Sequence, residues 1–346
     1  MENKVYNFTL NLDWNLLRIV SKIDRFDASW VAIEKKEKQS LRQLKDIATV
    51  RSVGASTRIE GSKMSNEEVK VLLDDIDITK IEDRDAQEVV GYFDVLDLIS
   101  ENYQEIEITE SNLKNLHNIL LKHSDKDQWH RGNYKQHSNA VEATLPNGTK
   151  QIIFQTTNAG YETEDAMRNL IEWYNNDNET HPLVKSALFL YEFVSIHPFQ
   201  DGNGRLSRLL ATLLLLKNGY NWIQYVSLEH EIESRKSEYY IELRKCQAER
   251  PNENVTNWIN FFFDALMNIQ EQLIRKLEVK GTKAKLSPRE KSILVFIENN
   301  AGTKSGDVAR KLNIPNPTVK RILTKLVNDN LIEKYGIGAG TNYSIK

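Results

Sequence analysis

Two long apolar runs separated by a short polar stretch constrain the fold of this chain most strongly. The first run covers residues 187–196 and the second covers residues 209–216. Both runs are long enough to be buried helices rather than strands. The polar stretch, residues 197–208, reads His-Pro-Phe-Gln-Asp-Gly-Asn-Gly-Arg-Leu-Ser-Arg and contains proline and Asn-Gly turn signals. The sequence therefore predicts a loop held between two core helices.

This loop contains the groups that a bound anion and a metal ion require. Gly202 and Gly204 permit backbone conformations in which N–H groups converge on an anion, and the following helix adds the positive end of its dipole. Arg205 and Arg208 are three residues apart, so they share one face of that helix and can donate to phosphate oxygens. Asp201 is a hard oxygen ligand of the kind that holds Mg²⁺.

His197 opens the same loop. A neutral imidazole can accept a proton from an incoming hydroxyl near pH 7. No Ser or Cys is paired with it locally, so a covalent triad is the poorer interpretation. Each residue taken alone has an ordinary structural explanation: a capping histidine, a turn, or two solvated arginines. The combination therefore carries the functional hypothesis.

Nine specified positions within these twelve residues match the pattern His-Pro-Phe-x-Asp-Gly-Asn-Gly-Arg-x-x-Arg. The stretch resembles the active-site signature of the Fic family, enzymes that typically transfer AMP from ATP to a protein hydroxyl. The resemblance implies that His197 deprotonates a Ser, Thr or Tyr hydroxyl of the target. It implies that Asp201 holds the Mg²⁺ ion bridging the phosphates of ATP, and that pyrophosphate leaves after direct displacement at the α-phosphorus. The nucleotide-binding residues that it implies are Gly202, Asn203, Gly204, Arg205, Leu206, Ser207 and Arg208.

A second short motif precedes the signature. Ser56 and Glu60 lie on one face if the segment is helical, and Gly61 is placed to end the helix. On these grounds alone, the segment could be a helix end with an exposed glutamate. The pattern Ser-x-x-x-Glu-Gly resembles the inhibitory motif of the Fic family, which implies a salt bridge from Glu60 to Arg208. Such a carboxylate occupies an arginine needed by ATP and repels its phosphates.

Turn-rich sequence lies between the two motifs. Residues 151–154 form a β-prone run, and Pro146-Asn147-Gly148 is a turn signal, so we expect a hairpin with its turn at 146–148. This hairpin could be an inert surface feature. The Fic resemblance implies a flap that registers the target side chain by strand addition. This chain has Thr156-Thr157 where many relatives have prolines, which leaves the registering residues undefined.

Tyr240 belongs to a tyrosine pair, residues 239–240, within a segment predicted to be helical over 229–246. A tyrosine pair on a helix is ordinarily part of the core. The Fic resemblance implies that Tyr240 flanks the base or ribose of the nucleotide.

The C-terminal part of the chain is basic. Residues 283–346 hold 12 Lys and Arg against 5 Asp and Glu, a net charge of +7, whereas the remainder holds 34 against 44, a net charge of −10. This asymmetry indicates different partners for the two parts. Residues 280–285 have the composition of a linker.

Three helical patterns over 287–297, 305–312 and 317–327, followed by two β-prone segments separated by glycines, resemble a winged helix-turn-helix domain. A domain of this kind would bind DNA through the basic side chains of its third helix. Alternatively, it would serve protein docking or homodimer formation. The sequence leaves both alternatives open. The basic side chains are Lys320, Arg321 and Lys325.

We therefore predict a mostly α protein with three domains. Residues 1–100 form an N-terminal helical region with the inhibitory motif. Residues 101–280 form a Fic-type helical core with a small β-hairpin flap, and residues 284–346 form the winged helix-turn-helix.

Composition excludes other classes of protein. The single cysteine, Cys246, excludes an intramolecular disulfide framework and a multi-cysteine zinc site. No apolar run of about 18 residues is present, and the start of the chain lacks a signal-peptide pattern. We expect a soluble cytoplasmic protein with no membrane partner.

The expected function is Mg²⁺-dependent transfer of AMP from ATP to a hydroxyl of a protein target. Two other functions stay open. In one, Glu60 aligns a water molecule and the protein removes AMP from a target. In the other, the chain is a DNA-binding regulator whose core only senses a nucleotide.

Overall fold

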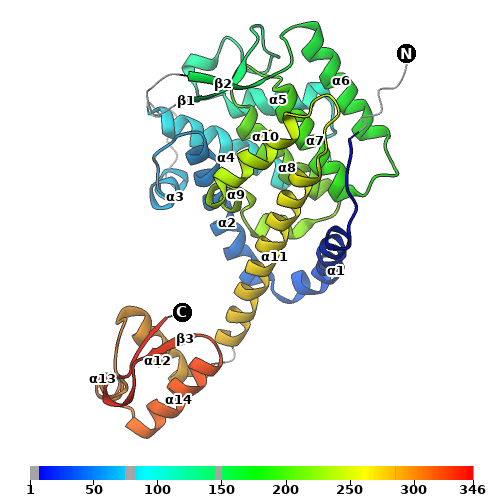
Figure 1. Ribbon diagram of the computed structural model, residues 1–346. Helices are drawn as coiled ribbons and strands as arrows, with labels where there is room; N and C mark the ends of the chain where they lie inside the picture. Colours follow the sequence, from blue (N-terminus) through cyan, green and yellow to red (C-terminus); the bar gives the residue numbers. More distant parts are fainter. Residues whose placement is uncertain (1–7, 75–80, 82, 145–149, 285, 346) are drawn as a thin grey trace. The chain divides into compact units, whose positions relative to one another are not determined.

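The computed structural model describes residues 8–74, 81, 83–144, 150–284 and 286–345. Within these residues the chain forms fourteen α-helices and four short strands (Figure 1), so it is mostly α, as predicted. It divides into two compact units, Met1–Gln270 and Glu271–Lys346. The three-domain division with boundaries near residues 100 and 280 stays a prediction.

Two apolar helices form the centre of the first unit. They are α7 (Pro182–Ile196) and α8 (Asn203–Lys217), and nearly all of their side chains are buried. A helix that is apolar on every face must be covered on every face. Accordingly, α8 contacts α7, α2 (Lys38–Ile59), α4 (Arg84–Asn102) and α5 (Glu110–Leu120). The two predicted core helices are therefore present, and residues 197–202 connect them.

Local capping explains where several helices begin. Asp13 accepts a hydrogen bond from the backbone N–H of Leu16 at 2.7 Å and starts α1, and Thr109 caps α5 in the same way through Asn112. The other helices of this unit are α1 (Trp14–Lys36), α3 (Asn66–Asp74), α6 (Tyr161–Asn176), α9 (Leu228–Ser234), α10 (Lys236–Gln247) and the first part of α11 (Thr256–Ala284).

One predicted helix and one predicted linker differ from the structure. The segment 229–246 is two helices, α9 and α10, that meet at Arg235. The hydroxyl of Ser234 donates to the carbonyl of Glu231, and such bonds compete with helical backbone bonds. The linker predicted over 280–285 is helical as far as Ala284, because α11 meets no proline before Pro288.

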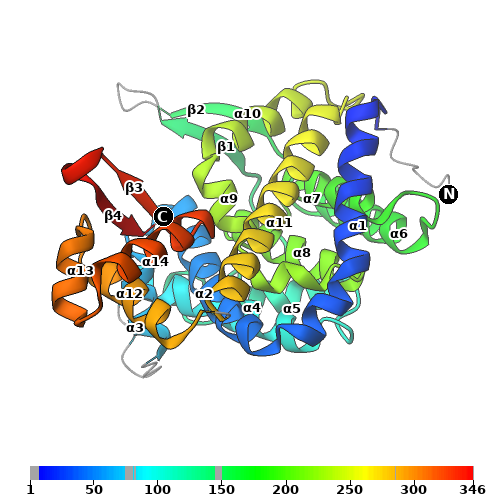
Figure 2. The same ribbon diagram turned by 90° about the horizontal axis from the view of Figure 1, so that it is seen from below.

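The predicted hairpin is formed by β1 (Ala140–Thr144) and β2 (Lys150–Gln155), which pair antiparallel with a bulge at Val141/Glu142. It lies at the edge of the helical unit in both ribbon views (Figures 1 and 2). The turn predicted at 146–148 lies outside the described residues.

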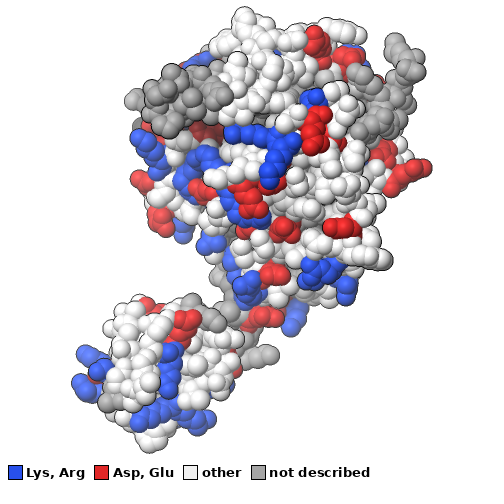
Figure 3. Space-filling model, in the orientation of Figure 1, with Lys and Arg blue, Asp and Glu red and all other residues white. Residues whose placement is uncertain are grey.

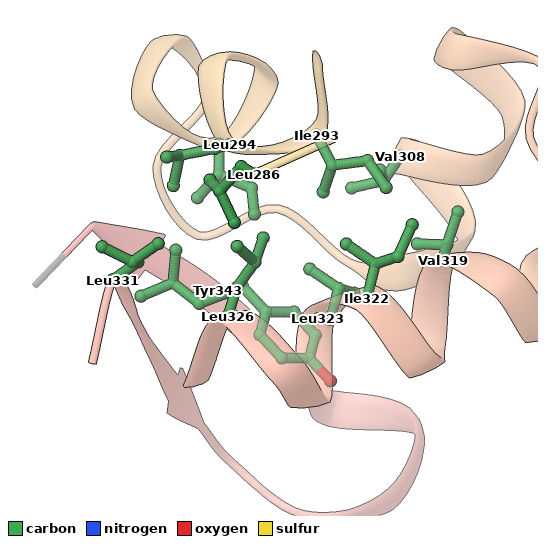
Figure 4. Close-up of a cluster of buried hydrophobic side chains, with 12 residues drawn as sticks. Leu286, Ile293, Leu294, Val308, Val319, Ile322, Leu323, Leu326, Leu331 and Tyr343 are labelled. Carbon is green, nitrogen blue, oxygen red and sulfur yellow. The ribbon is translucent and has the colours of Figure 1, made fainter. Parts of the chain in front are cut away.

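The second unit has the predicted winged-helix order. Its elements are α12 (Pro288–Asn299), α13 (Ser305–Leu312), α14 (Asn316–Asn328), β3 (Ile332–Tyr335) and β4 (Asn342–Ile345), and the two strands pair antiparallel. Ser287 and Glu290 form a capping box at the start of α12. Aliphatic side chains from all three helices and Tyr343 from β4 form one core (Figure 4).

No helix among the described residues is long and apolar enough to cross a membrane.

A close approach at Gly91 sets the spacing of α4 and α5. A Cβ atom at this position would lie 2.1 Å from the backbone oxygen of Leu120, nearer than any real contact. Only glycine therefore allows this packing, which places α5 against the loop between α7 and α8.

We expect Gly91→Ala to destabilise the protein by about 1–3 kcal/mol or more, because the two helices must separate. Urea unfolding followed by circular dichroism measures this change. Gly306→Ala is the matched control, since a Cβ there meets nothing within 4 Å. A Gly91→Ala protein as stable as the control protein would contradict the close contact.

Candidate active site

The backbone of the loop is shaped by two residues in the left-handed region. His197 ends α7 with φ 53°, and Gly202 begins α8 with φ 79°. The buried side chain of Asn203 closes the loop between them. It accepts from the N–H of Phe199 at 2.9 Å and donates to the carbonyl of Phe199 at 2.8 Å. These bonds occupy the side-chain oxygen of Asn203 and one of its two amide N–H groups.

His117 of α5 fixes the other end of the loop. The N–H of Gly132 donates to its Nδ1 atom at 2.9 Å, so its Nε2 atom carries the proton and donates to the carbonyl of Asp201 at 3.0 Å. Its ring stacks on Phe199 with centroids 3.8 Å apart. Burial lowers the pKa of His117 to about 4, which keeps it neutral. Sequence reasoning missed this residue, although a histidine on the apolar face of the predicted helix was a usable signal.

A cavity of about 220 Å³ opens beside this loop. Most of the predicted site residues line it: His197, Asp201, Gly202, Asn203, Gly204, Arg208, Glu60 and Tyr240. Tyr240 comes from α10, next to the buried Tyr239. Three other predicted residues do not line the cavity, because Arg205, Leu206 and Ser207 are buried among the helices.

The imidazole of His197 is in the form that a base requires. Its Nδ1 atom lies 3.4 Å from the carbonyl of Val194, which assigns the proton to Nδ1 and leaves the lone pair on Nε2. Burial lowers the pKa of His197 to about 4. The ring is therefore neutral at pH 7.

Asp201 presents an ionised carboxylate. Its Oδ1 atom accepts from the N–H of Gly202 at 2.6 Å and lies 3.5 Å from Nη2 of Arg205. Burial opposes ionisation, but the charge of Arg205 and this hydrogen bond outweigh it and lower the pKa of Asp201. The Oδ2 atom has a looser partner, the Nζ atom of Lys126 at 3.6 Å. This oxygen is therefore the better placed of the two to bind a cation.

The surroundings of Asp201 fit Mg²⁺ only together with a bound phosphate. Over the part of the chain that the structure describes, no three His, Cys, Asp or Glu side chains gather into a metal site. Mg²⁺ typically binds one or two carboxylates, substrate phosphates and water. A carboxylate beside an anion-binding helix start meets that description.

Arg205 supports the site from behind. Its Nη1 atom lies 3.3 Å from Oε2 of Glu88. The other carboxylate oxygen of Glu88, Oε1, accepts a hydrogen bond from Arg84. The Nε atom of Arg205 has no hydrogen-bond partner among the described residues. Arg205 therefore neutralises Glu88 and Asp201 inside the protein, and its expected contact with the outer phosphates stays a prediction.

Glu60 lies at the start of α8, where the helix dipole favours a negative charge. Its Oε1 atom lies 2.7 Å from Nη2 of Arg208, whose Nε atom donates to the hydroxyl of Ser56 at 2.8 Å. A Cβ atom built on Gly204 would lie 2.4 Å from the same Glu60 oxygen. The carboxylate therefore rests against the first turn of α8, at the positive end of that helix.

Charge keeps this pair ionised. Burial by itself would raise the pKa of Glu60, but the charge and hydrogen bond of Arg208 outweigh it, so the pKa of Glu60 lies below its usual value. Burial opposes the charge of Arg208 as well, and Glu60 more than compensates. The pair is thus ionised at neutral pH.

Two family models match parts of this chain. The Fic/DOC family model matches residues 107–215, a segment that includes the loop and His117. Residues 107–215 are therefore similar to a Fic domain. A second model, described as winged helix-turn-helix DNA-binding, matches residues 286–333.

Several curated relatives are named protein adenylyltransferase Fic. The protein from Drosophila virilis is 28% identical over 209 residues, which are 59% of this chain and 40% of the relative. The protein from Drosophila melanogaster is 29% identical over 187 residues, which are 52% of this chain and 35% of the relative. The chain thus spans about two fifths or less of the length of these relatives.

Solved structures share the fold. A Fic family protein from Desulfovibrio desulfuricans G20 aligns with a TM-score of 0.64 and 24% identity, covering 99% of this chain and 98% of that chain. A Fic domain containing signaling protein from Bacteroides thetaiotaomicron VPI-5482 aligns with a TM-score of 0.57 and 24% identity, covering 74% of this chain and 94% of that chain. The predicted fold class, a Fic-type helical core with a winged helix, is confirmed.

The helix that brings Glu60 to the Fic loop is anchored from outside the cavity. Arg58 forms two hydrogen bonds to Glu233 of α9, at 2.6 and 3.0 Å, and donates to the carbonyl of Met64. Lys236 at the start of α10 donates to the carbonyl of Ile59 at 2.6 Å. Sequence reasoning missed these contacts, which hold the end of α2 in place.

We expect the Arg58–Glu233 pair to contribute about 1 kcal/mol of coupling, because it is bidentate and half-buried. A double-mutant cycle of Arg58→Ala and Glu233→Gln in urea unfolding measures it, and hydrogen exchange at residues 56–62 should accelerate in each variant. Arg275→Ala, which breaks an exposed pair with Glu271, is the control with no expected effect. Additive effects of the two substitutions would refute the anchor.

Proposed function

We propose that this chain is a Mg²⁺-dependent protein adenylyltransferase that Glu60 holds in an inhibited state. One observation carries the proposal: the Glu60–Arg208 ion pair lies against Gly204, beside the loop that presents His197 and Asp201 to the same cavity. The names of the curated relatives support the same activity.

Each residue has a role that its geometry permits. The unprotonated Nε2 atom of His197 accepts the proton of a Ser, Thr or Tyr hydroxyl on the target. Asp201 would hold Mg²⁺, and the bound ion would neutralise negative charge on the phosphates. The start of α8, from Gly202 to Gly204, binds phosphate oxygens through its backbone, and Arg208 binds the γ-phosphate once Glu60 has left. Tyr240, which lines the same cavity, contacts the base or ribose in this proposal.

Glu60 inhibits by occupying the phosphate site. Its carboxylate uses the guanidinium that the γ-phosphate needs and places a negative charge at the helix start. Removal of the carboxylate makes the guanidinium available to the γ-phosphate and removes the negative charge from the helix start. Cytoplasmic location and homodimer formation stay predictions.

We expect Glu60→Gly to raise AMP transfer by roughly tenfold or more, since one charge-assisted hydrogen bond is worth about 1.5–3 kcal/mol. Mass spectrometry after incubation with Mg²⁺ and each nucleoside triphosphate in turn would record the gain of one nucleoside monophosphate and identify the donor. Glu60→Gly with His197→Ala should bind nucleotide but transfer nothing. Unchanged transfer by a folded Glu60→Gly protein would reject the inhibitory role.

Hydrolytic removal of AMP from a modified target is the rival reaction for the same residues. If Glu60 aligned a water molecule, the wild-type protein would release AMP from a modified target without ATP, and Glu60→Gly would abolish the release. Incubating an AMP-modified protein with each variant separates the two reactions.

A second function, DNA binding, is favoured by the family model that matches residues 286–333. Lys320 and Arg321 are exposed on α14, and Figure 3 shows Lys and Arg side chains on the surface of this unit. Lys325 is less available, because its Nζ atom pairs with Glu290 at 2.8 Å.

We expect the chain to bind duplex DNA with an affinity that falls steeply as salt rises. Lys320→Ala and Arg321→Ala should each weaken binding and reduce the salt slope by about 1 if the side chain contacts a phosphate. Fluorescence anisotropy at several salt concentrations measures both, with Lys291→Ala on α12 as the control. Absence of binding at low salt would favour protein docking instead.

A further inference from the structure

Lys135 is a buried lysine close to the active-site loop. It is 2% exposed and lies in the chain segment that leads into strand β1. Its ammonium donates to Oδ1 of Asn139 at 3.0 Å, to the hydroxyl oxygen of Thr156 at 2.9 Å and to the carbonyl of Ile196 at 3.0 Å. All three acceptors are neutral, and no carboxylate pairs with Lys135 among the described residues. Each N–H of the ammonium thus has an oxygen partner.

The same residue holds the backbone on both sides of His197. Its Nζ atom binds the carbonyl of Ile196, and its backbone N–H donates to the carbonyl of Pro198 at 2.8 Å. His197 has φ 53°, a left-handed conformation that is uncommon for a residue with a side chain. Such a conformation persists only where neighbouring groups determine it. Lys135 supplies two of those groups.

The ammonium also joins the two ends of the hairpin. Asn139 immediately precedes β1, and Thr156 immediately follows β2. The hydroxyl of Thr156 donates to the carbonyl of Asn139 at 2.7 Å, and the side-chain amide of Asn139 donates to the carbonyl of Phe199 at 3.0 Å. The ammonium of Lys135 therefore contacts the two residues that flank the hairpin and the carbonyl that precedes His197. Lys135 does not line the cavity.

We propose that Lys135 is a positioning residue that fixes His197 and the β1–β2 hairpin in one geometry, so that base and target strand are aligned with each other. The role rests on the proposed transfer function, and it acts on the transfer step and not on nucleotide binding. Methionine at this position would keep the volume but remove the donor shared by Asn139, Thr156 and the buried carbonyl of Ile196, which costs free energy and releases the loop.

The test uses the full chain with Glu60→Gly, so that transfer is measurable. Lys135→Met should bind ATP within about twofold of its parent by calorimetry, while transfer falls roughly 100-fold, as expected for a base displaced by about 1 Å. Hydrogen exchange at residues 138–140 and 153–157 should accelerate. Lys185→Met is the matched control: this lysine also donates to a carbonyl, that of Asp177, but at the far end of α7. It should change none of the three readouts.

Two further measurements keep the outcome decisive. Thr156→Val removes one acceptor and leaves the lysine in place. It should lower transfer by less than the roughly 100-fold expected for Lys135→Met, and it should not alter ATP affinity. This variant tests the role even if Lys135→Met does not fold. The imidazole resonances of His197 in the nucleotide-free protein should shift in both variants and stay unchanged in Lys185→Met.

Equal losses of ATP affinity and transfer rate in Lys135→Met and Thr156→Val would mean a general structural role and overturn the proposal. Unchanged transfer together with unchanged His197 resonances would overturn it as well. If the Glu60→Gly parent itself transfers nothing, the proposed function fails, and the resonances and hydrogen exchange still decide the positioning role.

Discussion

The buried guanidinium of Arg208 is the constraint on which the state of the site depends. It is 3% exposed, and a buried charge left without partners is strongly destabilising. Ser56 and Glu60, both from the end of α2, supply those partners. Since the carboxylate also rests against the start of α8, one ion pair both joins the end of α2 to α8 and places a negative charge at the positive end of that helix. In the proposed function, the structural need of Arg208 for a partner and the inhibition by Glu60 thus have the same physical cause.

A rigid loop is the second requirement, and buried polar side chains from outside α7 provide much of it. His117 from α5 holds the carbonyl of Asp201, and Lys135 holds the carbonyls that flank His197. Both ring nitrogens of His117 and the ammonium of Lys135 have hydrogen-bond partners, so neither side chain carries the cost of an unsatisfied buried group. Lys135 therefore supports the proposed base, His197, and His117 supports the proposed metal ligand, Asp201. The ring of His117 also stacks on Phe199, which lies between these two loop residues in the sequence.

Local sequence patterns were enough to predict the loop, its two helices and the winged helix, whereas the contact between Glu60 and Arg208, 148 residues apart, came only from the resemblance to the Fic family. They work because helical periodicity, glycine and a short motif act over a few residues. The supports were not predictable in this way, since His117 lies 84 residues from Asp201 and Arg58 lies 175 residues from Glu233. Their partners are chosen by tertiary packing, as at Gly91. Arg205 illustrates the limit, because its place in the motif did not reveal that Glu88 would be its neighbour.

The anchoring of α2 bears on how an occupied site could be vacated in the proposed function. Arg58 and Lys236 attach the last turn of α2 to α9 and α10, so moving the helix would break several charge-assisted bonds at once. The side chain of Glu60 is 32% exposed and sits at the helix end, where rotation into water costs one ion pair and gains hydration. Rotation of Glu60 about a fixed helix is therefore the less costly route. The incoming phosphate would then restore a partner to Arg208, and the buried charge would be compensated in both states.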